Sequence, residues 1–348
     1  MQISKDKVFE QMSKYPATRY MGSKQKLIPP LYDIFNKLKF DRALDIMSGT
    51  GVISYLLKCM GKQVISNDYM HMNYTISSAL IKNNSIKINN NFATKLLETN
   101  LKSQFITKTF KDLYFTESDS IMIDSIRNNI TSKTSYTQKA ICMSALIRSC
   151  IKKRPRGIFA YTGLRYDDGR KDLKKSIEEH FIENINIMNN AIFSNKKNNK
   201  ALNEDCMDIS DDAQLVYIDP PYFSKLSDNE YVRRYHFVEG LSKNWENIQL
   251  QESTKTKKFK SYPSPFTRLD STIEAFNKLF NKYKKNHIIL SYSSNSLPSK
   301  EVILSLLSKY KKHVYVNEIN YRYSFSNQDF AKDKIKNKVK EYIFVGTE

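Results

Sequence analysis

The stretch ALDIMSGTGVISYLLKCMGKQVISND, residues 43–68, decides the fold of this chain. It begins with the apolar run 43–47, continues with a segment of helical length that ends at Gly61, and closes with a second apolar run at 63–68. Continuous apolar runs are typical of strands that are covered on both faces, and glycine suits the position after a helix end. The order strand, loop, helix, strand therefore predicts a βαβ unit of an α/β fold.

Further apolar runs extend this pattern after a long interruption. Residues 69–200 consist mainly of long polar segments of helical character, which we interpret as an inserted subdomain. We therefore expect residues 1–68 and 201–348 to form one α/β domain that carries a mostly helical insertion. The additional strands are expected at LVYID (215–219), HIILSYS (287–293) and EYIFVG (341–346).

The charge of the chain favours a polyanionic partner. Its 348 residues carry 56 Lys and Arg against 36 Asp and Glu, a net charge of +20. Such a surface binds nucleic acid through the release of counterions, although an AT-rich genome would also enrich lysine. Residues 201–224 differ from the rest, because they contain six acidic residues and no basic one. A cationic cofactor beside this window would account for the contrast.

Other classes of protein find no support in the sequence. There is no apolar run of the roughly 18 residues that span a bilayer, and the first residues lack a signal-peptide pattern. The cysteines are scattered, with no pair or nearby histidine at the spacing of a metal site. We expect a cytoplasmic protein with reduced thiols, no metal and no membrane association. The four cysteines are Cys59, Cys142, Cys150 and Cys206.

A glycine-rich turn follows the first expected strand. In DIMSGTG, Asp45 to Gly51, the glycines allow a tight turn that brings backbone N–H groups close to a ligand. Asp68, at the end of the next strand, is placed to accept the two hydroxyls of a ribose. Together these features indicate a nucleoside-containing cofactor, and a purely structural turn is the alternative. The pattern of an ATP-binding P-loop is absent from this turn.

The sharpest signal is Asp219-Pro220-Pro221-Tyr222, which follows the apolar run LVYI. Open α/β sheets bind ligands at such strand ends. The amino nitrogen of adenine is a poor nucleophile, because its lone pair is delocalised into the ring. The Asp219 carboxylate and the Pro220 carbonyl can each accept one N–H and draw that lone pair out of conjugation. Tyr222 offers a ring on which a flipped base can stack. The alternative is a rigid strand-ending turn with a packing tyrosine.

With these motifs in place, the chain resembles the Dam-type N6-adenine DNA methyltransferases of the alpha group. Three elements of that family occur in its order: Arg19 to Lys24, Asp45 to Gly51 and Asp219 to Tyr222. Asn203 to Cys206 and Ser291 to Ser293 resemble two further motifs. The resemblance implies a Rossmann-like sheet, S-adenosylmethionine as cofactor and adenine in double-stranded DNA as substrate. It also implies a restriction-modification or related bacterial or phage context, in which a cognate restriction endonuclease is a partner.

The resemblance also assigns roles within the cofactor pocket. Tyr20 and Lys24 would line the methionine end of the cofactor, Asp68 would bind its ribose, and Asp205 with Cys206 would approach its adenine. The residues themselves leave other interpretations open. Lys24 could be a solvated lysine, Tyr20 could pack in the core, and Asp205 could belong to a turn. At the third position of the glycine-rich turn, where the family usually has phenylalanine, this chain has Met47. The cofactor-binding residues expected are Tyr20, Lys24, Asp45, Met47, Ser48, Gly49, Gly51, Asp68, Asp205 and Cys206.

In the family, the target-recognition region lies between the cofactor and catalytic halves, within residues 69–200 here. Arginines and aromatics mix in KKRPRGIFAYTGLRYDDGR, residues 152–170, where we expect a β-hairpin that reads DNA. An ordinary basic surface is the alternative. The helix that carries His236 either approaches DNA or packs, and His236 is expected to be structural. The DNA-binding residues expected are Arg154, Arg156, Tyr161, Arg165 and Arg170.

Three competing functions share parts of this pattern. An RNA adenine methyltransferase would use the same four catalytic residues and a basic surface. A protein-glutamine methyltransferase is disfavoured, because such enzymes usually have Asn at the position of Asp219. A catalytically inactive DNA-binding module is disfavoured by the intact Asp219 to Tyr222 element.

Overall fold

The protein is described from a computed structural model, in which residues 3–163, 170–224, 230–322 and 338–348 are placed. Within this described part, the chain combines helices and strands, and seven strands form a sheet in the order β3-β2-β1-β4-β5-β7-β6. The predicted α/β class is confirmed. The strands are β1 (Arg42–Asp45), β2 (Gln63–Asn67), β3 (Lys200–Leu202), β4 (Leu215–Ile218), β5 (His287–Ser293), β6 (His313–Arg322) and β7 (Lys338–Thr347).

Packing divides the chain into two compact units. The first unit comprises residues 1–29, 48–204 and 231–262, and the second comprises the remaining residues. Residues 69–200 thus pack with neighbours from three parts of the chain, and their separate role in target recognition stays a prediction. Helices of the first unit are α1 (Lys5–Met12), η1 (Gln25–Leu27), α3 (Val52–Cys59), α4 (His71–Ser77), η2 (Ser78–Lys82), α5 (Asn90–Lys95), α6 (Phe105–Thr109), α7 (Glu117–Lys133), α8 (Tyr136–Lys152), η3 (Pro155–Gly157), η4 (Lys171–Leu173), α9 (Ile177–Ala191) and α10 (Tyr231–Ser242).

The second unit holds five strands and the helices beside them in sequence. β1, β4 and β5 run parallel, and β7 pairs antiparallel with β5 and β6. All four residues of β4 are buried, as expected of a parallel strand covered on both faces. The helices are η5 (Pro265–Thr267), α11 (Leu269–Lys282), α12 (Lys300–Ser308) and α2 (Ile28–Lys37), which begins at the end of the first unit.

Helix α3 forms and ends as its sequence predicts. Every one of its eight residues is buried, so the segment VISYLLKC is held by packing on all sides. The helix ends where Gly61 takes φ 76°, a left-handed conformation that glycine adopts without strain. There Gly61 N–H donates to Lys58 O, and Lys62 N–H donates to Leu57 O, at 3.0 and 3.1 Å. This pair of bonds is the Schellman motif, which satisfies the last carbonyls of the helix.

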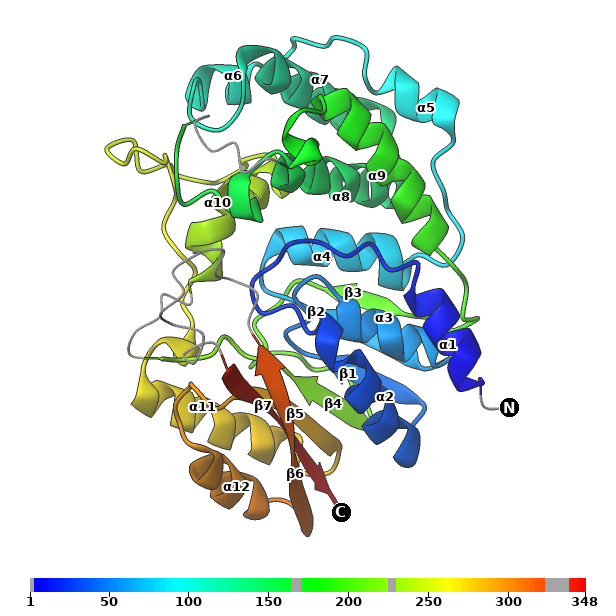
Figure 1. The fold of residues 1–348 in the computed structure, drawn as a ribbon, viewed down its shortest axis with the longest axis vertical. Coiled ribbons are helices and arrows are strands. Elements are labelled where there is room, and N and C mark those ends of the chain that lie inside the picture. The colour runs from blue at the N-terminus through cyan, green and yellow to red at the C-terminus, as the bar shows by residue number, and fades with distance from the viewer. Residues whose placement is uncertain (1–2, 164–169, 225–229, 323–337) are drawn as a thin grey trace. The chain divides into compact units, whose positions relative to one another are not determined.

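Residues 69–200 are mostly helical in the described part, as expected. Helices α7, α8 and α9 lie side by side (Figure 1). Twelve of the seventeen residues of α8 are buried, so this helix forms the centre of the group. None of the helices that the structure describes combines the length and the apolar character of a membrane span.

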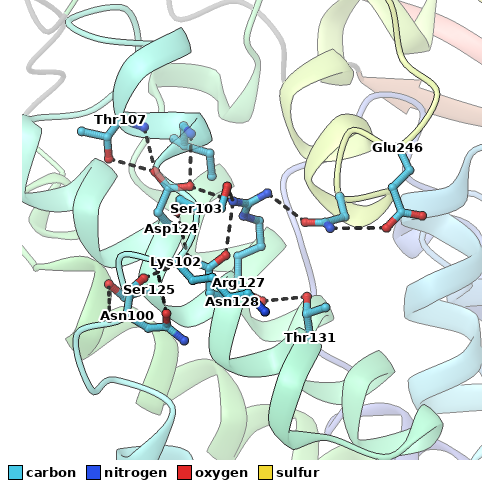
Figure 2. Close-up of polar contacts among 12 residues, drawn as sticks. Asn100, Lys102, Ser103, Thr107, Asp124, Ser125, Arg127, Asn128, Thr131 and Glu246 are labelled. Atoms are coloured by element: carbon cyan, nitrogen blue, oxygen red, sulfur yellow. Dashed lines mark hydrogen bonds and ion pairs between the residues drawn. The ribbon is translucent and has the colours of Figure 1, made fainter.

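A buried ion pair within α7 holds the start of α6. Asp124 accepts hydrogen bonds from the backbone N–H groups of Ile106 and Thr107, and thereby caps the start of α6. Arg127 donates to Asp124 at 3.2 Å and to Ser103 and Asn244 at 2.8 Å each. Figure 2 shows Asp124 and Arg127 at the centre of this network of polar side chains. Because both charges are buried, the network fixes the loop before α6 through directed bonds.

Candidate active site

The sheet reverses its order of strands between β1 and β4. From β1 the chain proceeds outward through β2 and β3, whereas β4 and β5 continue on the other side. Ligands of open α/β folds bind beyond the carboxyl ends of strands at such a switch point. Asp45, the last residue of β1, pairs with Tyr217 of β4, and Asp219 follows β4 directly. The expected placement of the glycine-rich loop and Asp219 on adjacent strand ends is therefore confirmed.

The segment Asp219 to Tyr222 leaves β4 as a loop braced by two prolines. Pro220 is buried, while Asp219, Pro221 and Tyr222 are partly exposed. Each proline fixes its own φ and restricts the backbone of the residue before it, so the backbone of Asp219 and the Pro220 carbonyl are held with little freedom. Rigid acceptors suit a ligand whose donors must be met in one geometry.

Tyr222 is positioned by β5 and β7. Its hydroxyl donates to Oε2 of the buried Glu341 at 3.0 Å, and its ring meets that of Tyr292 edge to face, with centroids 5.0 Å apart. The Tyr292 hydroxyl donates in turn to Leu297 O, and Leu297 N–H donates to Phe223 O at 2.9 Å. Glu341 was not among the predicted site residues, because its only signal is a carboxylate at the start of the apolar run YIFV.

Beneath the loop, Tyr217 and Ser291 share a buried hydrogen bond of 2.7 Å between their hydroxyls. Burial, followed by the negative charge of Asp219, raises the pKa of Tyr217 well above its ordinary value. Tyr217 therefore stays neutral and serves as a scaffold between β4 and β5. The Ser291 to Ser293 motif is accounted for in the same way, as support for the loop.

The loop after β1 makes the tight turn expected of its glycines. Gly49 and Gly51 have φ values of 53° and 82°, which side chains larger than hydrogen rarely allow. Ser48 N–H donates to Asn67 O, and Gly51 N–H donates to Ser48 O, both at 2.8 Å. A Cβ on Gly49 would lie 3.3 Å from the ring of Tyr20, so the loop and that ring are in close contact.

Asp68 ties this loop to the end of β2. Its Oδ2 accepts from Gly49 N–H at 2.8 Å, and its Oδ1 accepts from Met70 N–H at 2.9 Å. Each carboxylate oxygen can accept further donors, which is what two ribose hydroxyls require. Burial raises the pKa of Asp68 to about 7, although both N–H groups act in the opposite direction.

Tyr20 and Lys24 lie in the segment that follows α1. The Tyr20 ring stacks on that of Tyr235, with centroids 4.9 Å apart, and its hydroxyl accepts from Nδ2 of Asn73 at 3.0 Å. Burial raises the pKa of Tyr20 well above its ordinary value. Lys24 is buried rather than solvated, and its Nζ donates to Gly22 O at 2.8 Å.

Two polar atoms near these residues indicate room for a polar ligand. The Oγ of Ser48 and the Oδ1 of Asn73 are buried, and neither has a hydrogen-bond partner among the described residues. Buried polar atoms are nearly always satisfied, so such atoms point to an absent ligand or water. The glycine turn, the Asp68 acceptors and these two atoms fit the polar groups of a nucleoside cofactor. Asn73 was not among the residues predicted for the site.

Glu239 of α10 holds the start of α4. Its carboxylate accepts from His71 N–H and Met72 N–H at 2.9 Å each, and from the Tyr262 hydroxyl at 2.7 Å. Burial raises its pKa above the ordinary value. A carboxylate on the first N–H groups of a helix is favourable, and this one fixes the helix that carries Asn73.

Asp205 and Cys206 form a turn in the second unit. Oδ1 of the exposed Asp205 accepts from Met207 N–H at 2.9 Å, so the turn interpretation of this residue holds in the structure. Cys206 is buried, and burial raises the pKa of its thiol to about 12. All four cysteines lie buried as free thiols. A role of Asp205 and Cys206 toward a cofactor stays a prediction.

The residues expected to contact DNA differ in their placement. Arg154 is buried, and its guanidinium donates to Tyr114 O at 2.9 Å and to Tyr161 O at 2.6 Å. Its charge is thus used inside the protein, to fix the segment that carries Tyr161. The Tyr161 side chain is 59% exposed, and Arg170 is partly exposed, with one bond to Arg154 O at 2.9 Å. Arg165 and the side chain of Arg156 lie outside the described residues.

One expectation for this region is wrong, and a second one concerns the helix that carries His236. The described residues between 152 and 170 form a single 3₁₀ turn, η3, and contain no strand, so the expected β-hairpin is not formed there. Pro155, the positive φ values of Gly157 and Gly163, and the inward bonds of Arg154 favour an irregular loop. On α10, His236 is buried beside Phe159 O at 3.2 Å and the Tyr114 hydroxyl at 3.1 Å. His236 is therefore structural, as expected, and an approach of this helix to DNA stays a prediction.

Comparisons with known proteins agree with this geometry. Residues 20–294 match the family described as D12 class N6 adenine-specific DNA methyltransferase. Type II methyltransferase M2.HphI of Haemophilus parahaemolyticus is 28% identical over 91% of this chain and 94% of its own length. Type II methyltransferase M.CviAII of Paramecium bursaria Chlorella virus 1 is 26% identical over 93% and 97%. Modification methylase StsI of Streptococcus sanguinis is 26% identical over 91% of this chain and half of its own length.

Proposed function

Because the chain belongs to the D12 class of N6 adenine-specific DNA methyltransferases, we propose that S-adenosylmethionine is its methyl donor and that Asp219 to Tyr222 hold the target adenine. The observation that carries the proposal is the position of this loop, directly after β4 and next to the end of β1, where the sheet changes direction. The family specifies DNA, which removes the RNA alternative, and the net charge of +20 suits that substrate.

The proposed chemistry follows from the two acceptors of the loop. Asp219 and Pro220 O each accept one N–H of the adenine amino group, so that the nitrogen becomes more tetrahedral and its lone pair is free to attack. As the N–C bond forms, the S–C bond of the donor breaks. The extra proton on the methylated nitrogen passes to Asp219 or to water. Tyr222 stacks against the adenine, which must first be flipped out of the duplex.

S-Adenosylmethionine supplies, when bound, a methyl group on a positively charged sulfur. In the first unit, Asp68 would accept the two ribose hydroxyls, while Tyr20 and Lys24 would meet the methionine end. Ser48, Gly49 and Gly51 would bring their polar groups against the ligand, with Asn73 as an additional acceptor. The support for this arrangement is the glycine turn, the Asp68 acceptors and the two buried atoms without partners. Asp45, Met47, Asp205 and Cys206 belong to the second unit, and their contact with the cofactor stays a prediction from the sequence.

For DNA we propose a contact surface within residues 69–200. Its best-supported member is Tyr161. The side chain of Tyr161 is exposed, and its backbone carbonyl accepts a hydrogen bond from Arg154. Arg170 would contact phosphate, and Arg156 and Arg165 belong to the same segment. We propose Arg154 as the residue that fixes this segment, and no longer as a direct DNA contact.

The biological setting is proposed from the relatives. Their names describe type II methyltransferases and a modification methylase. We infer that this enzyme protects cellular DNA by methylating one target sequence in the cytoplasm, and that a restriction endonuclease with the same target is its partner. A digest of methylated DNA with candidate endonucleases would identify that partner.

Expression in a host free of DNA methylation tests the proposed function. We expect single-molecule sequencing of the host genome to reveal N6-methyladenine at one recurrent sequence, because the loop binds a single flipped base. The purified enzyme should transfer labelled methyl from S-adenosylmethionine to duplex DNA containing that sequence. Soluble protein that binds the cofactor while the genome stays unmodified would instead support the inactive DNA-binding module.

The bond between Tyr222 and Glu341 provides a second prediction. We expect Tyr222→Phe and Glu341→Leu each to lower kcat about tenfold, because a hydrogen bond to a buried carboxylate contributes roughly 1.5–3 kcal/mol to the placement of the ring. The double variant should lose little more than either single variant, since both remove the same bond. Fully additive losses of kcat, measured as methyl transfer to an unmethylated duplex oligonucleotide that contains the target sequence, would contradict this coupling.

A further inference from the structure

A buried arginine of α8 forms hydrogen bonds to the segment that precedes Tyr20. Arg148 donates from one terminal nitrogen to Pro16 O at 2.5 Å and to Oγ1 of Thr18, and from the other to Ala17 O at 3.2 Å. On its opposite side, Nε donates to Oδ1 of Asn184 on α9 at 3.1 Å. The planar guanidinium thus bonds three consecutive residues while α9 fixes its orientation.

This use of a charge is costly unless it has a purpose beyond packing. Arg148 is only 5% exposed, and no carboxylate among the described residues forms an ion pair with it. Burial lowers its pKa to about 10, so it remains charged at neutral pH. An apolar residue of similar size would fill the same volume without the cost of desolvating a charge. What an apolar residue could not supply is a set of directed bonds to backbone carbonyls.

The segment that Arg148 binds has no regular secondary structure. Residues 13–24 form neither helix nor strand, so contacts with other elements must fix their course. The Tyr15 hydroxyl donates to Thr50 O at 2.8 Å, and Met21 N–H donates to the Tyr235 hydroxyl at 2.9 Å. Between these two anchors lie the carbonyls that Arg148 binds. Loss of the hydrogen bonds from Arg148 would allow the backbone before Tyr20 and Lys24 to take other conformations.

We propose that Arg148 is a positioning residue for the cofactor: it holds residues 16–18 so that Tyr20 and Lys24 meet the methionine end of S-adenosylmethionine. The inference rests on the proposed function, because it takes those two residues to line the cofactor. Arg148 itself touches no substrate. Its effect is on the affinity of the cofactor, and the methyl-transfer step is untouched once the cofactor is bound.

Arg148→Lys tests the proposal, with Arg127→Lys as a matched control. Both arginines are buried in the first unit and both bind neighbouring loops, and Figure 2 shows that the partners of Arg127 belong to the network around Asp124. Lysine keeps the charge but cannot bond three acceptors with one planar group. We expect Arg148→Lys to raise the Kd and KM for S-adenosylmethionine about tenfold, with little change in kcat or in the KM for DNA. Arg127→Lys should lower Tm without moving the Kd.

The outcomes are separable. A Kd that rises in both variants in proportion to their loss of Tm would reduce Arg148 to a structural residue and overturn the proposal. An unchanged Kd in Tyr20→Ala and Lys24→Ala, with binding intact in the natural protein, would overturn the premise about the cofactor pocket instead. If Arg148→Lys fails to fold, Thr18→Val removes one of the bonds at almost constant volume. Thr18→Val should raise the Kd for S-adenosylmethionine by a smaller factor than Arg148→Lys. An unchanged Kd would contradict the proposed role of Arg148.

Discussion

Replacement of Asp219 by alanine should lower kcat by roughly 100- to 1000-fold, the loss seen when one oriented partner of a reacting group is removed. Asp219 follows β4 directly and precedes the buried Pro220, so its backbone is fixed at the strand end, and alanine there removes the acceptor carboxylate altogether. Asp219→Asn keeps one acceptor oxygen and should lose less than Asp219→Ala. Methyl transfer to a duplex oligonucleotide, under saturation with S-adenosylmethionine, measures all three proteins.

The Asp219 prediction is specific to the chemical step. The Kd for S-adenosylmethionine should stay within about twofold, because Asp219 is proposed to meet adenine and not the cofactor. Asp208→Ala is the matched control, since Asp208 is an exposed acid of the same acidic window. It should retain full kcat. Equal losses in both variants would mean that the charge of the window matters, and would contradict a particular role of Asp219.

The strands that decide the fold could be predicted, because their sequences report their environment. β1, β2, β4 and β5 are buried on both faces, and continuous apolar runs such as LVYI follow from that burial. Gly61 likewise marked the end of α3. β6 escaped detection because HVYVNEINYR mixes polar with apolar residues and has no continuous apolar run as long as those of the central strands, as suits the strand that ends the described sheet next to β7. β3 has three residues, which is too short for any pattern.

The site could be predicted only where a motif carries its own chemistry. Asp219 and Asp68 were found from their places at strand ends. Glu341 and Asn73 were not, because their partners are distant in sequence and only folding brings them together: Glu341 bonds a tyrosine 119 positions away. The same limit explains Arg154. In KKRPR nothing distinguishes an arginine that faces solvent from one whose guanidinium turns inward onto backbone carbonyls.

Asp68→Asn should weaken the binding of S-adenosylmethionine by about 100-fold. Two ribose hydroxyls that donate to a carboxylate contribute roughly 3 kcal/mol or more together, and a neutral amide retains only one acceptor oxygen. The carboxylate also fixes the loop through its bond to Gly49 N–H. Calorimetric titration of both proteins measures the difference. Similar affinities in the two proteins would place the ribose elsewhere.

The affinity of the natural protein should also depend on pH. Its Asp68 has a pKa near 7 without ligand, and hydroxyl donors favour the ionised form. Affinity should therefore rise with pH up to about 7, by as much as about tenfold per unit, and level off above it. S-Adenosylhomocysteine, which has the same ribose but no positive sulfur, should show the same step. A step seen with S-adenosylmethionine alone would assign the effect to the sulfur charge.

Stability should move in the opposite direction over the same range of pH. A pKa raised from 3.8 in the unfolded chain to about 7 means that the folded state binds more protons between these values. The contribution of Asp68 to the free energy of unfolding is thus present in full below about pH 4 and is lost as pH rises through 7. The Tm of the natural protein, relative to Asp68→Asn, should fall between pH 5 and about 8 while cofactor affinity rises. One carboxylate then accounts for both trends. Burial makes its ionised form costly in the free protein, and hydrogen bonds from the ribose hydroxyls offset that cost when the cofactor binds.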